Sequence, residues 1–168
     1  MGQYQLAIRD YNKAITVNPD HPDAYKNREL VYSKLGLQRT VEDYNEAIRS
    51  RPDYADAYHD RGVAYAKLGQ DQRAVEDYTK AISLKRDYVD AYNDRGVAYA
   101  KLGQYQRAIE DYTKAIRLKQ DYADAYNNRG ITYFKQGSKK LCCDDLLKAC
   151  KLGNCKTLQA ARNSGDCP

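Results

Sequence analysis

The chain has 168 residues, of which 42% are hydrophobic and 30% charged, a composition typical of a folded protein and not of a disordered chain. Its net charge is +5, and the segment 137–168 carries six basic against three acidic side chains, so the remainder is nearly balanced. Because proteins that bind nucleic acid usually concentrate basic residues in a stripe, this distribution argues against nucleic acid or a membrane surface as a partner. No segment has the ~20 consecutive apolar residues of a membrane span.

Tyrosine is abundant and periodic, with 17 Tyr against one Phe and no Trp. The tyrosines fall into columns that recur at a nearly constant spacing, and the clearest column is Tyr25, Tyr58, Tyr92 and Tyr126. Residues 55–88 and 89–122 are identical at 28 of 34 positions. Such near copies indicate the duplication of a structural unit.

Each unit is predicted to be a hairpin of two helices. In residues 55–67 the apolar and aromatic side chains fall at helical intervals, and Gly69 suits a left-handed turn after the first helix. The second helix, over 71–84, places five apolar side chains on one broad face. These are Ala74, Val75, Tyr78, Ala81 and Ile82.

The repeat divides the chain into six predicted segments. They are an orphan second helix of a truncated repeat (1–20), an irregular repeat (21–54), two regular repeats (55–88 and 89–122), a divergent last repeat (123–152), and a capping helix with a cysteine-containing tail (153–168). The first helix has no hairpin partner, so part of its apolar face should be uncovered. Either the chain is a fragment of a longer array, or that face pairs with another chain.

The irregular repeat departs from the pattern in three ways. Glu29 replaces the first-helix glycine, Thr40 replaces the second-helix alanine, and one residue is missing from the turn at 36–39. Glycine and alanine stand where paired helices touch, so these changes should splay the hairpin, and residues 23–49 could run as one helix that pairs with a second molecule. The alternative is a normal hairpin with a tighter turn, in which the Glu29 carboxylate reaches solvent.

The period and the motif residues resemble the tetratricopeptide repeat (TPR) family over about residues 1–152. The motif residues are Tyr58, Gly62, Tyr65, Ala74, Tyr78 and Ala81, repeated as Tyr92, Gly96, Tyr99, Ala108, Tyr112 and Ala115. The resemblance implies an all-α fold: a right-handed α-solenoid of helix-turn-helix hairpins with a C-terminal capping helix. It also suggests a bacterial protein and a fragment of a longer array.

One departure from the family is systematic. Where the family often has Leu before the first-helix glycine, this chain has Arg in every copy: Arg28, Arg61, Arg95 and Arg129. We expect each Arg to reach an acidic residue on the second helix, such as Asp77 or Asp111. An exposed pair of this kind is worth ~0–1 kcal/mol.

All five cysteines lie in residues 142–167, without a CxxC pair or a nearby histidine, so no metal site is predicted. Cys142, Cys143 and Cys150 align with core positions and are expected to be small buried hydrophobes. Cys155 and Cys167 bracket the capping helix and could form a disulfide; alternatively, all five cysteines are reduced. The localisation stays open, because reduced cysteines fit the cytoplasm and a disulfide fits a periplasmic or secreted protein.

Little in the sequence points to catalysis: the two histidines, His21 and His59, are far apart in the chain, and no phosphate-binding loop or nucleophile elbow occurs. We therefore predict neither an enzyme nor a cofactor. By the TPR resemblance, the first helices line a concave groove with an apolar floor, an acidic edge and a basic edge. The expected groove residues are Asp56, His59, Val63, Ala66, Lys67, Asp90, Asn93, Val97, Ala100, Lys101, Asp124, Asn127, Ile131, Phe134 and Lys135.

These features predict a protein–protein interaction scaffold that binds a peptide or helix segment of an unidentified protein partner in the groove. The carboxylate clamp of some family members is matched only at Lys26, so capture of a peptide's terminal carboxylate is not expected. The alternative is a self-assembly or domain-swapping module that forms homo-oligomers through the orphan N-terminal helix and the irregular second repeat.

Overall fold

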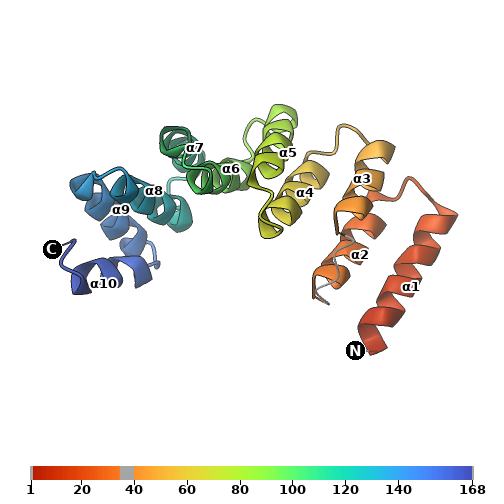
Figure 1. The fold of residues 1–168 in the computed structure, drawn as a ribbon. Helices are drawn as coiled ribbons and strands as arrows, with labels where there is room; N and C mark the ends of the chain where they lie inside the picture. The colour runs from red at the N-terminus through yellow and green to blue at the C-terminus, as the bar shows by residue number, and fades with distance from the viewer. Residues whose placement is uncertain (1, 35–39, 168) are drawn as a thin grey trace. The chain divides into compact units, whose positions relative to one another are not determined.

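The computed structural model describes residues 2–34 and 40–167, which contain ten α-helices and no β-strand (Figure 1). The helices are α1 (Gly2–Val17), α2 (Pro22–Lys34), α3 (Thr40–Ser50), α4 (Ala55–Lys67), α5 (Asp71–Leu84), α6 (Val89–Lys101), α7 (Tyr105–Leu118), α8 (Ala123–Lys135), α9 (Lys139–Lys151) and α10 (Lys156–Asn163). Contacts divide the chain into two compact units, residues 1–86 with α1–α5 and residues 87–168 with α6–α10. None of the described helices combines the length and the apolar character needed to cross a membrane.

The predicted apolar face of the second helix is the core of each regular hairpin. All five residues predicted for this face of α5 are buried, as are their equivalents on α7. The turn before α5 is formed as expected, with Gly69 at φ 72° and the Gln70 amide donating to the Tyr65 carbonyl over 2.9 Å. A hairpin therefore packs by the helical period that its sequence carries.

The two helices of a hairpin approach most closely at the first-helix glycine. A Cβ atom on Gly96 would lie 2.6 Å from Cε1 and 2.9 Å from Cδ1 of the Tyr112 ring. Gly62 and Tyr78 form the same contact in the preceding hairpin. Since Tyr112 is itself buried, its ring has little room to retreat.

Substitution of Gly96→Ala should therefore destabilise the second unit, which can be measured as a lower urea midpoint of unfolding. Alanine favours a helix over glycine by about 1 kcal/mol, but overpacking a core costs roughly 1–3 kcal/mol. The control is Ser83→Ala at an exposed position of α5, which should leave the midpoint unchanged or higher. A Gly96→Ala protein with an unchanged midpoint would contradict the close packing.

The irregular repeat accommodates its glutamate inside the hairpin. Glu29 on α2 is only 6% exposed, and its Oε2 accepts a hydrogen bond of 3.1 Å from the Tyr44 hydroxyl on α3. The expectation that Glu29 reaches solvent is thus wrong. In the regular repeats the equivalent tyrosine packs on a glycine, whereas in this repeat Tyr44 donates a hydrogen bond to the buried carboxylate. Helices α2 and α3 contact each other as separate helices, which argues against one helix through 23–49. The shortened turn at 36–39 and the Thr40 side chain lie outside the described residues.

The predicted arginine–aspartate pairs join the two helices of every hairpin. Arg95 donates from Nε and Nη2 to the two Asp111 carboxylate oxygens over 2.7 and 2.8 Å. The remaining pairs are Arg61–Asp77 and Arg129–Asp145, both bidentate, and Arg28–Asp43. The low value of an exposed pair does not apply, because the Asp111 side chain is only 9% exposed and that of Arg95 16%.

In two of the repeats the guanidinium also contacts the preceding second helix, and tyrosine rings lie beside it. Arg61 Nη1 donates to Asn45 Oδ1 on α3 over 2.7 Å, and Arg129 Nη1 donates to Thr113 Oγ1 on α7 over 2.9 Å. Tyrosine rings flank each arginine; the Arg95 Cζ lies 5.7 Å from the Tyr92 ring and 5.8 Å from the Tyr99 ring, within cation–π range. In Arg61 and Arg129, one side chain therefore joins three helices.

Removal of one partner should leave the other charge half-buried and unpaired. Breaking a buried ion pair costs about 3 kcal/mol, so Arg95→Ala and Asp111→Asn should each lower the urea midpoint strongly. The exposed Arg117→Ala on α7 should stay within about 0.5 kcal/mol of the parent protein. Equal midpoints for all three variants would show that the pair contributes no stability.

The N-terminal helix is less covered than its equivalents. No side chain described in α1, from residue 6 onwards, is fully buried, and Leu6 is 50% exposed. Ile15 packs against the cluster that contains Tyr25, Tyr44 and Ala47. The helix thus contacts α2 while part of its apolar surface faces solvent, as the sequence predicts.

The C-terminal helix is held against α9 by two disulfides, and neither is the predicted Cys155–Cys167 pair. The bonds are Cys143–Cys167 and Cys150–Cys155, which leaves Cys142 as a buried thiol. The prediction fails because Cys167 and Cys155 are bonded to Cys143 and Cys150, which lie seven residues, or about 10 Å, apart along α9. Cys143 and Cys150 are therefore bridge partners and not merely small buried hydrophobes, whereas Cys142 is buried as expected.

Candidate functional site

A cavity of about 140 Å³ lies between the first helices of two consecutive repeats in the second unit. Helix α6 contributes Val97, Ala100 and Lys101, at the i, i+3 and i+4 positions that share one helix face. Helix α8 contributes Asn128, Ile131, Thr132 and Lys135, which also share one helix face, and Tyr112 of α7 completes the lining. Lys101 and Lys135 both line the cavity and are exposed, and Lys135 Nζ also lies 5.9 Å from the centroid of the Tyr105 ring.

Five of the predicted groove residues meet at this cavity: Val97, Ala100, Lys101, Ile131 and Lys135. The repeat explains why they converge. Val97 and Ile131 are one repeat period apart, as are Lys101 and Lys135, so they occupy equivalent positions on consecutive first helices. Their role in binding a ligand stays a prediction.

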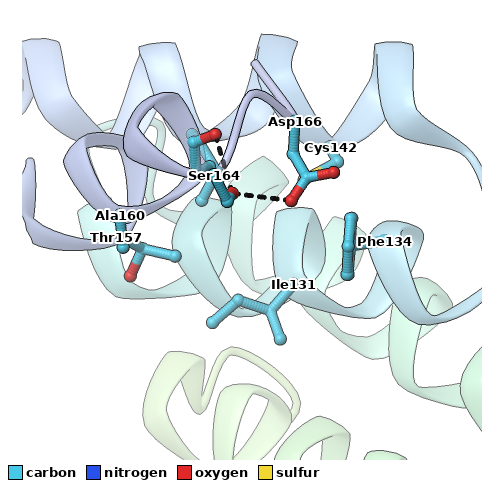
Figure 2. A pocket seen from close by; sticks show the side chains of 9 residues that line it. Ile131, Phe134, Cys142, Thr157, Ala160, Ser164 and Asp166 are labelled. Carbon is cyan, nitrogen blue, oxygen red and sulfur yellow. Dashed lines mark hydrogen bonds between the residues drawn. The ribbon is translucent and has the colours of Figure 1, made fainter.

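A second, larger cavity of about 380 Å³ shares Ile131 with the first (Figure 2). Ile131 and Phe134 of α8 lie on one side, and Thr157 and Ala160 of α10 lie on the other, with Ser164 just after that helix (Figure 2). Phe134 is 43% exposed, a high fraction for a large aromatic ring. The capping helix thus stands where the first helix of a further repeat would stand, and it extends the apolar lining.

Sequence reasoning missed two polar residues of the smaller cavity. The Thr132 hydroxyl donates to the Asn128 carbonyl over 2.8 Å, and Asn128 Nδ2 donates to Asn93 Oδ1 over 3.1 Å. The signal that could have found them is a break in the columns, since Thr132 stands where the two regular repeats have alanine and Asn128 where they have aspartate. Asn93 is buried, so this predicted groove residue joins α6 to α8 and does not face a ligand.

The acidic edge of the predicted groove is largely engaged by the protein itself. Asp90 accepts a hydrogen bond of 2.9 Å from the Tyr122 hydroxyl, and Asp124 accepts one of 3.0 Å from Asn154 Nδ2. Burial, followed by the hydrogen bond to Asp90, raises the pKa of Tyr122, so its hydroxyl stays a donor. Asn127, from the polar column, has a buried Oδ1 with no hydrogen-bond partner among the described residues.

The predicted groove residues of the first unit lie on α4. Val63 and Ala66 are half-buried, Lys67 is exposed and Asp56 lies in the first turn. His59 belongs to a polar cluster, with Nδ1 3.3 Å from Asp60 Oδ1 and its ring centroid 5.5 Å from that of Tyr78.

Asp60 is the centre of that cluster. Lys26 Nζ lies 3.6 Å from Asp60 Oδ2. Burial acts to raise the pKa of Asp60, but the hydrogen bond to His59 and the Lys26 charge outweigh it, so that pKa lies below its ordinary value. This arrangement keeps Asp60 ionised and binds α2 to α4, a structural role.

Comparison with known proteins identifies the family. The TPR repeat profile matches residues 1–36, 39–69, 64–103 and 98–137, and the tetratricopeptide repeat profile matches residues 123–152. No curated protein sequence matches the chain.

Solved structures share the fold. A structure of MamA has a TM-score of 0.83 and 27% identity, covering 93% of this chain and 92% of its own. YrrB, described as a TPR protein with an unusual peptide-binding site, has a TM-score of 0.80 and 21% identity, covering 97% and 84%. A thermophilic TPR protein of Thermus thermophilus, TTC0263, has a TM-score of 0.74 and 21% identity, covering 98% and 91%.

Family profiles that match most of the chain and neighbours that share its helical hairpins agree with the expected all-α solenoid fold and with a bacterial origin. The chain therefore belongs to the tetratricopeptide repeat family.

Proposed function

We propose that this protein is a non-catalytic scaffold that binds an extended peptide segment of a partner protein across α6, α8 and α10 of the second unit. The observation that carries the proposal is the pair of adjoining cavities, which share Ile131. A peptide that crosses both would meet two lysines at the first and an apolar surface at the second. TPR repeats provide such scaffolds, and YrrB is a TPR protein described as having a peptide-binding site.

The smaller cavity fits an acidic side chain. Its volume of about 140 Å³ holds only a few non-hydrogen atoms, and Lys101 and Lys135 flank it from two helices. Two ammonium groups at one opening favour a carboxylate over a neutral or basic group. Asn128 and Thr132 add polar atoms to the lining.

The larger cavity fits a bulky apolar side chain. Ile131, Phe134, Leu146 and Ala161 give it a mostly apolar lining, and its volume of about 380 Å³ lies at the small end of ligand sites. Burying a side chain the size of Leu or Phe contributes about 1.5–3 kcal/mol. The preferred ligand is thus a segment with an acidic residue close to a large apolar one.

The proposal predicts that charge reversal at the lysines weakens binding. Peptides with an acidic and an apolar residue, selected on an array with the parent protein, should bind the double variant Lys101→Glu, Lys135→Glu at least about tenfold more weakly, as measured by fluorescence anisotropy. Affinity for the parent should fall with added salt, because exposed charges are screened.

The matched control reverses the charge of a lysine outside the cavity, and a further variant alters the apolar lining. Lys114→Glu, at an exposed position of α7, should retain full affinity. Val97→Glu places a carboxylate in the cavity lining and should abolish binding while the helix content stays constant. Peptides that bind the lysine double variant and Val97→Glu as tightly as the parent would disprove this site.

The exposure of α1 favours a second candidate function, which is self-assembly. Leu6 is half-exposed and Val17 is 79% exposed on a helix that has no fully buried side chain among its described ones. Two copies that paired these helices would cover both apolar faces, in an interface related by a twofold axis.

Self-assembly predicts a solution mass that rises with concentration from the monomer value of 19.2 kDa towards twice that value, as measured by light scattering after size exclusion. Leu6→Asp should hold the mass at the monomer value. Leu141→Asp, at a similarly exposed position of α9, should leave the behaviour of the parent unchanged. A parent protein that stays at 19.2 kDa at every concentration, with or without reductant, rejects this candidate.

A further inference from the structure

Three cysteine sulfurs meet at the junction of α9 and the C-terminal tail. The Sγ atoms of Cys142, Cys143 and Cys167 all lie within 4.8 Å of one another, and all three residues are buried. Cys143 and Cys167 form a disulfide, and Cys142 is a thiol. The second disulfide, Cys150–Cys155, is not part of this cluster.

We propose that Cys142 exchanges with the Cys143–Cys167 disulfide, so that the C-terminal tail has two alternative covalent anchors on α9. In this reaction the Cys142 thiol loses its proton to solvent, and the thiolate attacks Cys167 Sγ. A Cys142–Cys167 bond forms, the Cys143–Cys167 bond breaks, and Cys143 leaves as a thiolate that takes up a proton. The number of disulfides is unchanged, so the exchange needs no external oxidant or reductant.

Cys167 is the sulfur that the geometry favours as the target. Attack on Cys143 would join two neighbours in sequence, and that bond would have to close within one dipeptide of α9. Attack on Cys167 joins α9 to the tail, as the existing disulfide does. The tail also has contacts that do not depend on the disulfide and keep Cys167 near α9 during the exchange: Lys139 Nζ lies 3.0 Å from Asp166 Oδ1, and the Asp166 amide donates to the Ala161 carbonyl over 2.8 Å.

The charges around Cys142 make the exchange dependent on pH. Burial raises the pKa of the Cys142 thiol, and the carboxylates of Asp145 on α9 and Asp166 on the tail raise it further. The cations on the facing elements are paired with those carboxylates, Arg129 of α8 with Asp145 and Lys139 with Asp166. Exchange should therefore be slow at neutral pH and faster in alkali, since only the thiolate attacks.

The two anchors face different cavities. Cys142 lines the cavity of about 380 Å³ next to Phe134, whereas Cys143 lines another cavity, of about 300 Å³, with Lys140 and Leu147. Asp166 lines both, so the tail runs between them. A Cys142–Cys167 bond would draw the tail towards the larger cavity and reshape it. The exchange itself does not depend on the proposed peptide ligand, but it would control the cavity assigned to the apolar side chain.

The test locates the free thiol. Oxidised full-length protein is incubated at neutral pH and at about pH 9.5, above the ordinary thiol pKa, and then quenched with acid. It is next unfolded, labelled with a thiol-specific alkylating reagent and digested. Tandem mass spectrometry separates label on Cys142 from label on its neighbour. We expect label on Cys143 to appear with time, faster at the higher pH, while Cys150 and Cys155 stay unlabelled.

Two variants make the result decisive. Cys143→Ser should form a Cys142–Cys167 disulfide on mild oxidation, because the second anchor is then the only partner in the cluster. Cys142→Ser should keep Cys143 unlabelled at both pH values, since the attacking sulfur is missing. Parent label confined to Cys142 throughout would overturn the proposal, and so would label spread over Cys150 and Cys155, which would indicate general scrambling.

Discussion

An arginine in the first helix of every repeat is the interaction on which the rest of the packing depends. In Arg61, Arg95 and Arg129 the guanidinium meets both oxygens of an aspartate on the second helix, and in Arg61 and Arg129 it also reaches the preceding second helix. Arg28 contacts one oxygen of Asp43. A bidentate pair is satisfied in only one relative register of the two helices. Because these side chains are largely withdrawn from water, a shifted register would leave a half-buried charge without its partner, at a cost of several kcal/mol. The close approach at Gly62 and Gly96 occurs in the same register.

The candidate site follows from this fixed register. Consecutive first helices of the second unit carry the same arginine pair, and residues one period apart on them, such as Val97 and Ile131, line the same cavity. Near-identical repeats produce a regular surface, and a regular surface by itself selects partners weakly. Residues that depart from the repeat therefore distinguish this site from the equivalent positions of the other repeats. Thr132 and Asn128 bring polar atoms into the cavity, and Phe134 exposes an aromatic ring beside the capping helix.

Helix α10 and the C-terminal tail are held differently from the helical hairpins. The repeat at 123–152 is followed by α10, which has only eight residues with which to cover the open face of that repeat. The core contribution of this segment is small: Leu158 of α10 and Cys167 of the tail pack with Cys142, Cys143 and Leu146 of α9. Two disulfides supplement that core, and the bond from Cys143 to Cys167 closes a loop of 24 residues, which limits the unfolded chain by roughly 3 kcal/mol in the loop-entropy account. The cavity beside α10 thus lies next to the part of this unit that relies most on covalent bonds.

The sequence by itself determined the period, the helices, the buried face of each second helix and the partners of the arginines. All of these are local patterns or patterns repeated in several copies, so each copy supports the others. It also indicated five of the eight residues that line the smaller cavity, because they are one period or one helical turn apart. Only the tertiary structure decided how deeply the Arg–Asp pairs are buried, that Tyr44 supplies a hydrogen bond to Glu29, that Asn93 turns inward, and which cysteines are joined. The burial of the Arg–Asp pairs depends on how closely the surrounding helices pack, and the other outcomes depend on distances between segments that occur once in the chain. Neither kind of outcome leaves a periodic trace in a single sequence.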